Sequence, residues 1–189
     1  MHKSVISRSI PLLAATASLS ILAAACGVAE SDRDYAAPRQ LCGTPVHPKL
    51  LAPFLPGGKQ LEVVRADSGV IGQRRCNVLV DHKRVLSMES QWRSPGTEIA
   101  DVSASGWQID VSEHIAADRT YSFSEEGGVS KVLCPNPAKE WRSTKGQLFV
   151  SMYTLDPDPK NEAGMEALLT SYARATGRMP DCNSPGAGS

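Results

Sequence analysis

The sequence predicts an α+β domain built on an antiparallel β-sheet, with a short N-terminal helix and a longer C-terminal helix packed on it. First, the middle of the 189-residue chain alternates apolar and polar residues with a period of two, which is typical of half-buried antiparallel strands. Second, apolar residues recur at helical spacing before and after these strands. Third, cysteines spread over the same region form an even set that can pair.

The first predicted element is a helix of one or two turns in LCGTPVHPKLLAPFLPGG, residues 41–58. Its apolar residues at helical spacing are Leu50, Leu51, Phe54 and Leu55. Pro48 suits the first turn, Pro53 limits the helix, and the following Pro-Gly-Gly ends it. We expect Cys42 to pin this helix to the rest of the domain.

Three strands are predicted next, in QLEVVR, RCNVLVD and RVLSMESQWR. The residues that share one face of each strand are Leu61 and Val63, then Cys76, Val78 and Val80, then Leu86, Met88 and Trp92. The residues DHKR, between Val80 and Val85, form a short hairpin loop.

Further strands are predicted in the second half of the chain. GWQIDV places Trp107, Ile109 and Val111 on one side. TYSFSEEGGVSKVLC predicts a hairpin whose loop contains Gly127-Gly128, because glycine adopts positive φ at little cost. Residues 147–155 are the longest strand candidate, and their continuous apolar run indicates a central strand covered on both faces.

The last predicted element is a helix in NEAGMEALLTSYARATG. Either Asp158 or Asn161 can cap it, and Gly177 is its expected end. Its apolar stripe is Met165, Leu168, Leu169, Tyr172 and Ala175. We expect Cys182 to fasten the end of this helix back onto the sheet.

Residues 1–25 have the pattern of a secretory signal peptide. Lys3 and Arg8 precede an uncharged apolar run, Ile10–Ala25, which is shorter than the roughly 20 residues that a membrane span needs. The run ends in Leu22-Ala23-Ala24-Ala25-Cys26, which resembles the lipobox of bacterial lipoproteins, although alanine stands where leucine is commonest. The alternative is an ordinary signal peptide in which Cys26 only lies near the cleavage point.

Lipidation at Cys26 has a strong physical consequence. One myristoyl-sized chain binds a membrane only marginally, whereas two or three chains on Cys26 would hold the protein there. We therefore expect a lipid-anchored protein on the extracytoplasmic face of the cell membrane. Residues 26–40 are polar and predict a flexible tether, residues 41–182 form the domain, and residues 183–189 are a disordered tail.

The remaining cysteines, Cys42, Cys76, Cys134 and Cys182, predict two disulfides in an exported chain. Four cysteines allow three connectivities. We favour Cys42 with Cys76 and Cys134 with Cys182, because this pairing closes the shorter loops. A four-thiolate metal site would need close CxxC-like pairs, which the chain lacks. We expect no metal.

No motif in the sequence indicates catalysis, a cofactor or nucleic-acid binding. Lys and Arg equal Asp and Glu at 20 each, and cleavage after residue 25 would remove two basic residues and no acidic one, leaving about −2. His47, His82 and His114 lack the spacing of a zinc site. The serine motif GxSxG and a glycine-rich phosphate loop are also missing.

The candidate contact surface is PNPAKEWRSTKG, residues 135–146, the longest segment without a strand or helix pattern. Long loops in compact domains are often functional. Trp141 has no apolar neighbours in the sequence, so we expect it to be exposed, with Arg142 beside it.

From Cys42 to Cys182 the chain resembles the small lipoproteins of actinobacteria, streptomycete type, that carry paired cysteines. The matching stretches are LCGTPVHPKLLAPFLPGG, RCNVLVD, VLCPNP and LLTSYARATGRMPDC. This resemblance implies an exported, lipid-anchored α+β domain with two disulfides. It supplies no activity and no catalytic residues to carry over to this chain. The predicted function is a non-enzymatic binding module of the cell envelope, with a protein, polymer or small solute as its partner. The alternative is an envelope hydrolase with dispersed catalytic residues.

Overall fold

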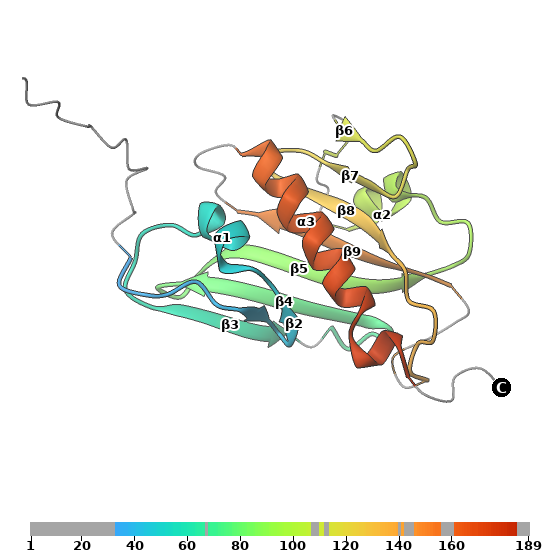
Figure 1. The fold of residues 1–189 in the computed structure, drawn as a ribbon, viewed down its shortest axis with the longest axis horizontal. Coiled ribbons are helices and arrows are strands. Elements are labelled where there is room, and N and C mark those ends of the chain that lie inside the picture. The colour runs from blue at the N-terminus through green and yellow to red at the C-terminus, as the bar shows by residue number, and fades with distance from the viewer. Residues whose placement is uncertain are drawn as a thin grey trace, which may run out of the picture. The chain divides into compact units, whose positions relative to one another are not determined.

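The computed structural model describes residues 33–66, 68–106, 110–111, 114–139, 141, 146–155 and 161–184. All of them belong to one compact unit, Ser31–Ser189. The predicted signal peptide and Cys26 lie outside the described residues. A mostly antiparallel sheet, a short helix near the N-terminal end and a longer C-terminal helix confirm the predicted α+β fold class (Figure 1).

Seven antiparallel strands of the described chain form the main sheet, in the order β3-β4-β5-β9-β8-β7-β6. Their bounds are β3 Leu61–Ala66, β4 Gln73–Val80, β5 Lys83–Arg93, β6 His114–Ile115, β7 Tyr121–Phe123, β8 Gly127–Val132 and β9 Gln147–Thr154. Two meanders, β3 to β5 and β6 to β9, meet where β9 pairs with β5. The continuous apolar run therefore lies in a central strand as predicted, although β5, with 11 residues, is the longest.

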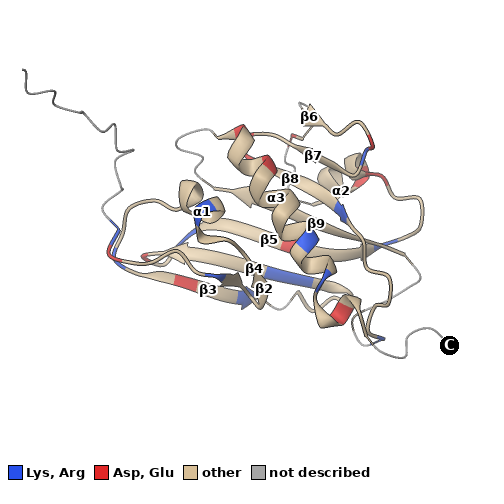
Figure 2. Cartoon of the chain, viewed as in Figure 1, with Lys and Arg blue, Asp and Glu red and all other residues tan. Residues whose placement is uncertain are grey.

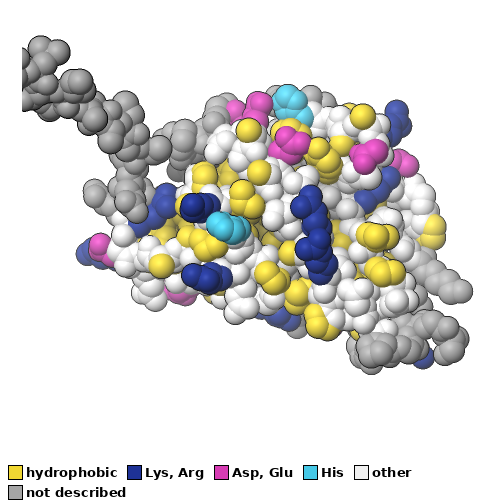
Figure 3. Space-filling model, in the orientation of Figure 1, with side chains coloured by type: hydrophobic (Ala, Val, Ile, Leu, Met, Phe, Trp, Pro, Cys, Tyr) yellow, Lys and Arg dark blue, Asp and Glu magenta, His cyan; other side chains and the backbone are white. Residues whose placement is uncertain are grey.

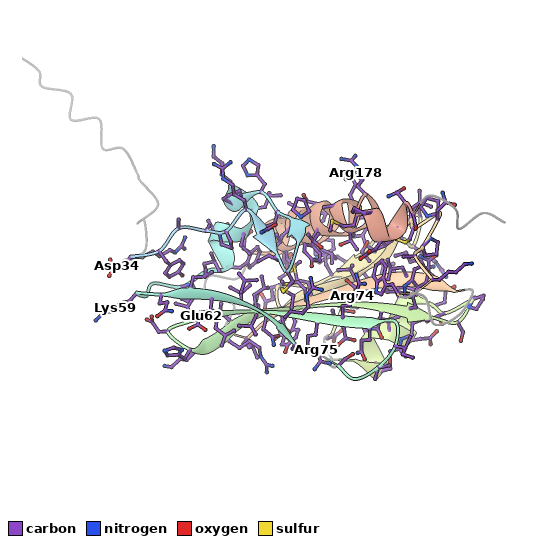
Figure 4. All side chains as sticks on the ribbon, turned by 90° about the horizontal axis from the view of Figure 1, so that it is seen from below. Asp34, Lys59, Glu62, Arg74, Arg75 and Arg178 are labelled. Carbon is purple, nitrogen blue, oxygen red and sulfur yellow. A yellow bond between two sulfur atoms is a disulfide. The ribbon has the colours of Figure 1, made fainter. Side chains whose placement is uncertain are left out.

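One face of the sheet is covered by a layer that we call the outer layer (Figure 4). It consists of helix α3 (Glu162–Gly177) and the N-terminal segment 33–58. That segment contains β1 (Gln40–Leu41), β2 (Thr44–Pro45), α1 (Pro48–Leu51) and the 3₁₀ helix η1 (Ala52–Phe54). Fully buried side chains from both layers form the main core, among them Leu41, Leu51, Leu86, Met88, Leu148, Met152, Met165, Leu168 and Leu169.

The other face carries helix α2 (Ile99–Ser105), which the sequence patterns did not predict. Its signal is weak because only Ile99 and Val102 are buried. A capping box between Glu98 and Asp101 begins the helix. A second apolar cluster forms here from Ile99, Val102, Val111, Val129, Phe149 and Tyr153. The strand predicted in GWQIDV falls largely outside the described residues; only its end, including the buried Val111, is described.

Both predicted helices are confirmed, with small differences. The His47 ring accepts a hydrogen bond from the Lys49 amide at the start of α1. The Asn161 side chain accepts one from the Gly164 amide at the start of α3. The buried stripe of α3 is Met165, Leu168, Leu169, Tyr172, Ala173 and Thr176, so Ala175, which is half-buried, was assigned wrongly.

The two predicted hairpins form with shorter loops than expected. Asp81 and His82 have φ of 48° and 65°, which gives a two-residue turn of the kind that matches strand twist. Lys83 and Arg84 therefore already belong to β5. Gly127 and Gly128 lie in β8 and not in the loop, so their predicted role as turn residues is wrong.

The predicted tether, residues 26–40, extends too far toward the C-terminus. Arg33 bridges to Gly58, and the Asp34 amide donates to the Gly58 carbonyl at 2.9 Å. Tyr35 packs against the main core. From Arg33 onward the chain is therefore part of the domain. In the described part of the chain, no helix combines the length and apolar character needed to cross a membrane.

Both disulfides form with the favoured connectivity. Cys42–Cys76 joins the N-terminal segment to β4, so it ties the outer layer to the sheet. Cys134–Cys182 joins the chain after β8 to the 3₁₀ helix η2 (Pro180–Cys182), which follows α3. This second bond fastens the end of the C-terminal helix, as predicted.

Candidate functional site: a cleft lined by arginines

A cleft of about 150 Å³ opens between the sheet and the outer layer beside the Cys42–Cys76 disulfide. Its lining includes Tyr172 and Thr176 from the C-terminal half of α3 and arginines of β3 and β4. Figure 2 marks basic residues on these two strands. The side chains that give the cleft its chemistry are Thr44, Arg65, Arg74, Trp141, Tyr172 and Asp181. The cleft is large enough for several waters or one small solute group.

Strand alternation explains why two arginines reach this cleft. Cys76 and Val78 point into the main core from β4, so Arg74, two residues before Cys76, lies on the same face. Arg65 follows Leu61 and Val63 on the corresponding face of β3. Figure 4 shows Arg74 between the sheet and the helix layer and Arg75 on the opposite side of the sheet.

Arg74 is held by two partners. Its guanidinium lies over the Trp141 ring, with Cζ 4.4 Å from the ring centroid. One of its nitrogens, Nη1, also donates to Oδ2 of Asp181. Stacking on an aromatic face and pairing with a carboxylate fix a planar guanidinium in one orientation. Arg74 is therefore a positioned donor group, although its charge is balanced by Asp181.

Arg65 differs from Arg74 because its charge is not balanced in this way. Its Nη2 donates to the Cys42 carbonyl at 2.6 Å, and the residue is exposed. No carboxylate of the described residues forms an ion pair with it. Arg75, by contrast, pairs with the buried Glu89 at 2.8 Å on the other face of the sheet. The mouth of the cleft is therefore positively charged through Arg65.

Tyr172 supplies a buried hydroxyl from α3. Burial raises the pKa of this hydroxyl, because the phenolate would be poorly solvated between helix and sheet. The hydrogen bond with Thr44 and the positive charge of the nearby Arg65 both lower this pKa, but they do not outweigh burial. Tyr172 is therefore a neutral hydrogen-bonding group well above neutral pH.

The raised pKa of Tyr172 predicts a loss of stability at alkaline pH. Tyrosine in the unfolded chain ionises near pH 10, whereas folded Tyr172 stays neutral to higher pH. Its contribution to stability is thus complete below about pH 10 and is lost as the pH rises toward the folded pKa. Urea unfolding at about pH 9 and about pH 11 should show a smaller pH-dependent loss in Tyr172→Phe than in the wild type. Equal losses in both proteins would contradict this assignment.

Trp141 is buried, so the prediction that it is exposed is wrong. Only 4% of its surface is accessible. Its ring packs edge-on against Trp92, with ring centroids 5.8 Å apart and planes at 79°. The Arg74 guanidinium covers the ring. These partners lie far away in the sequence, which is why its polar neighbours were misleading. Arg142, the other predicted contact residue, lies outside the described residues.

The indole N–H groups of Trp92 and Trp141 have no hydrogen-bond acceptor in the described structure. A tryptophan N–H can only donate. Trp141 lines the cleft, but its N–H is fully buried, so the donors that a bound group can reach are those of Arg65 and Arg74. These two guanidinium groups make the cleft a candidate site for hydrogen-bond acceptors, carboxylates or phosphates above all.

None of the described histidines pairs with a serine as it would in a serine hydrolase; each has another partner. His47 caps α1 through the Lys49 amide at 3.2 Å. The His82 ring lies 3.0 Å from a carboxylate oxygen of Glu62, and the His114 ring lies 3.1 Å from one of Glu162. None of these contacts belongs to the cleft.

Sequence reasoning missed Arg65, Arg74 and Asp181 as site residues. A signal for the arginines was available in the sequence. The alternation that places Cys76 on the inner face of β4 also places Arg74 on that face. Asp181 had no such signal, since its position depends on the Cys134–Cys182 disulfide. Comparisons of the chain with protein-family models, with curated proteins and with solved structures found no match.

Proposed function

We propose that this chain is an exported lipoprotein, anchored through acyl chains on Cys26, whose domain binds an anionic group in the arginine-lined cleft. It acts as a non-enzymatic binding module on the extracytoplasmic face of the cell membrane. The observation that carries the proposal is the pair of disulfides in a domain that follows a lipobox-like segment. Disulfides persist in exported proteins and are rare in the cytosol.

The cleft supports the binding part of this proposal. Arg65 offers an unbalanced positive charge at its mouth, and Arg74 offers a guanidinium already oriented by Trp141. Charge-assisted hydrogen bonds from arginine to carboxylate or phosphate are stronger than neutral ones. A cleft of about 150 Å³ suits one such group of a larger solute or polymer better than a whole cofactor.

Intact-mass spectrometry of protein purified from membranes tests the anchoring. The expected product begins at Cys26, carries the mass of its acyl chains and is lighter by four hydrogen atoms because of two disulfides. An unacylated protein recovered from the culture fluid, or a cytosolic protein with free thiols, would overturn the proposal.

Binding to the cleft is tested with inorganic phosphate as the probe, at constant ionic strength set by chloride. Phosphate should raise the melting temperature of the wild type, because a ligand that binds only the folded state stabilises it. Arg65→Gln should lose most of this rise. Lys83→Gln, which removes an exposed positive charge from the β4–β5 hairpin, is the matched control and should retain it. Equal responses in the two variants would exclude the cleft as the binding site.

A further inference from the structure

Two stretches of the chain that lie mainly in the outer layer carry positive charge without acidic residues. From Tyr35 to Leu61 the sequence contains basic residues and no Asp or Glu, and the same holds from Ala167 to Pro180. Their exposed basic residues are Arg39, Lys49 and Lys59 in the first stretch and Arg174 and Arg178 at the end of α3; Lys59 follows the N-terminal segment, and the other four belong to it or to the end of α3. We call Arg39, Lys49, Arg174 and Arg178 the basic face. None of them takes part in an ion pair of the described structure.

The members of the basic face belong to elements that pack together. Helix α3 contacts both β2 and α1, so its outward side continues into the N-terminal segment. Figure 3 shows basic side chains over the middle of this face; most of its acidic side chains lie toward the β6–β7 end, and a few lie at the opposite edge. Two of those acids, Glu162 and Glu166, are bound to His114 and to the Tyr121 hydroxyl. Because the whole chain has equal numbers of basic and acidic residues, attraction to an anionic surface has to come from a local group of charges rather than from net charge.

The length of chain between the anchor and the domain limits how far this face can lie from a membrane. Residues 26–32 separate Cys26 from Arg33, where the N-terminal segment joins the domain. An extended chain spans at most about 3.6 Å per residue, which gives about 25 Å for this tether. Arg33 is itself part of the outer layer, so the layer that carries the charge also carries the tether.

We infer that the basic face lies against anionic phospholipid headgroups of the membrane that holds the Cys26 anchor. This inference rests on the proposed anchoring, but not on ligand binding in the cleft. Each Lys or Arg close to an anionic leaflet strengthens association about fivefold at physiological salt. Four such residues on one face orient the domain, whereas the acyl chains alone would leave it free to rotate on its tether.

The experiment compares the labelling of two lysines in the acylated, full-length mature protein bound to vesicles. Lys49 lies on the basic face, and Lys131 lies on the other side of the sheet, where its amine is 3.4 Å from a carboxylate oxygen of Glu98. Vesicles contain either phosphatidylcholine alone or phosphatidylcholine with phosphatidylglycerol, and a water-soluble amine reagent is read out by peptide mass spectrometry. Labelling of Lys49 relative to Lys131 should fall several-fold on the anionic vesicles only, and high salt should restore it.

Two pairs of substitutions make the test specific to the basic face. Arg174→Gln with Arg178→Gln should abolish the protection of Lys49. Arg84→Gln with Arg119→Gln removes two exposed positive charges elsewhere and should leave the protection unchanged. Equal labelling on neutral and anionic vesicles, or equal effects of the two pairs, would overturn the inference.

The failure of this inference is distinguishable from the failure of the proposed function. An intact mass without acyl chains contradicts the proposed function, whereas an acylated protein with unprotected Lys49 contradicts only the membrane-facing surface. Protection of Lys49 by soluble polyphosphate on neutral vesicles, without protection on anionic vesicles, would overturn the inference in favour of an anionic polymer.

Discussion

Replacing both Cys134 and Cys182 with alanine is expected to lower the free energy of unfolding by about 4 kcal/mol. The two residues are 48 apart in the sequence, and a closed loop of that length restricts the unfolded chain by this amount in the chain-entropy account. Cys182 is also fully buried in the main core, so the substitution removes packed atoms as well. Urea unfolding of the oxidised variant and the wild type measures the difference, and a loss below about 1 kcal/mol would contradict the prediction.

The matched control is the other disulfide. Cys42 and Cys76 are 34 apart, and loop length alone makes the two expected losses differ by only about 0.3 kcal/mol. A much larger loss at Cys134–Cys182 would therefore measure local packing. The Asn136 and Ala138 amides donate to the carbonyls of Cys182 and Asp181 at 3.0 and 2.7 Å, so this disulfide supports a backbone pairing. Its removal should also loosen Asp181, the partner of Arg74, and weaken phosphate binding in the cleft.

Periodicity in the sequence predicted most of the sheet and the C-terminal helix, because burial on one face repeats with the geometry of each element. Cys76, Val78 and Val80 are buried as the alternation indicates. Met165 and Leu168, on α3, are buried as the helical spacing indicates. The pattern does not report burial that arises from contacts distant in the sequence. Trp141 is the clearest case, since Trp92 and Arg74 cover it.

Pairing between main-chain groups also could not be predicted from the residue types. The polar stretch that ends at Gln40 looks like a tether, yet Arg33 bridges to Gly58 through main-chain groups that any residue provides. Helix α2 was missed for a related reason, because a short helix with two buried residues carries almost no period. The candidate site could be predicted in part: alternation placed Arg74, but only the folded chain brings Trp141 and Tyr172 to it.

Gly128 of β8 also has a role that only the packed structure explains. A Cβ built on Gly128 would lie 2.6 Å from a methyl carbon of Leu169 on α3 and 2.9 Å from the Ser122 carbonyl oxygen. The second atom belongs to the backbone of the neighbouring strand β7 and cannot move independently. Glycine therefore permits the close approach of α3 to the sheet at this point, and does not serve as a turn residue.

Gly128→Ala is accordingly expected to destabilise the protein by about 3 kcal/mol, at the upper end of what overpacking usually costs. The measurement is the free energy of unfolding in urea, with the native fold checked by far-ultraviolet circular dichroism.

A double-mutant cycle with Leu169→Ala separates helix packing from strand geometry. Shortening Leu169 removes the methyl group that the new Cβ would meet, so Gly128→Ala should cost at least about 1 kcal/mol less in that background. The cost that remains belongs to the contact with the Ser122 carbonyl. An undiminished cost would show that the helix yields to the added methyl group, and that the spacing between α3 and β8 is set by other side chains of the main core.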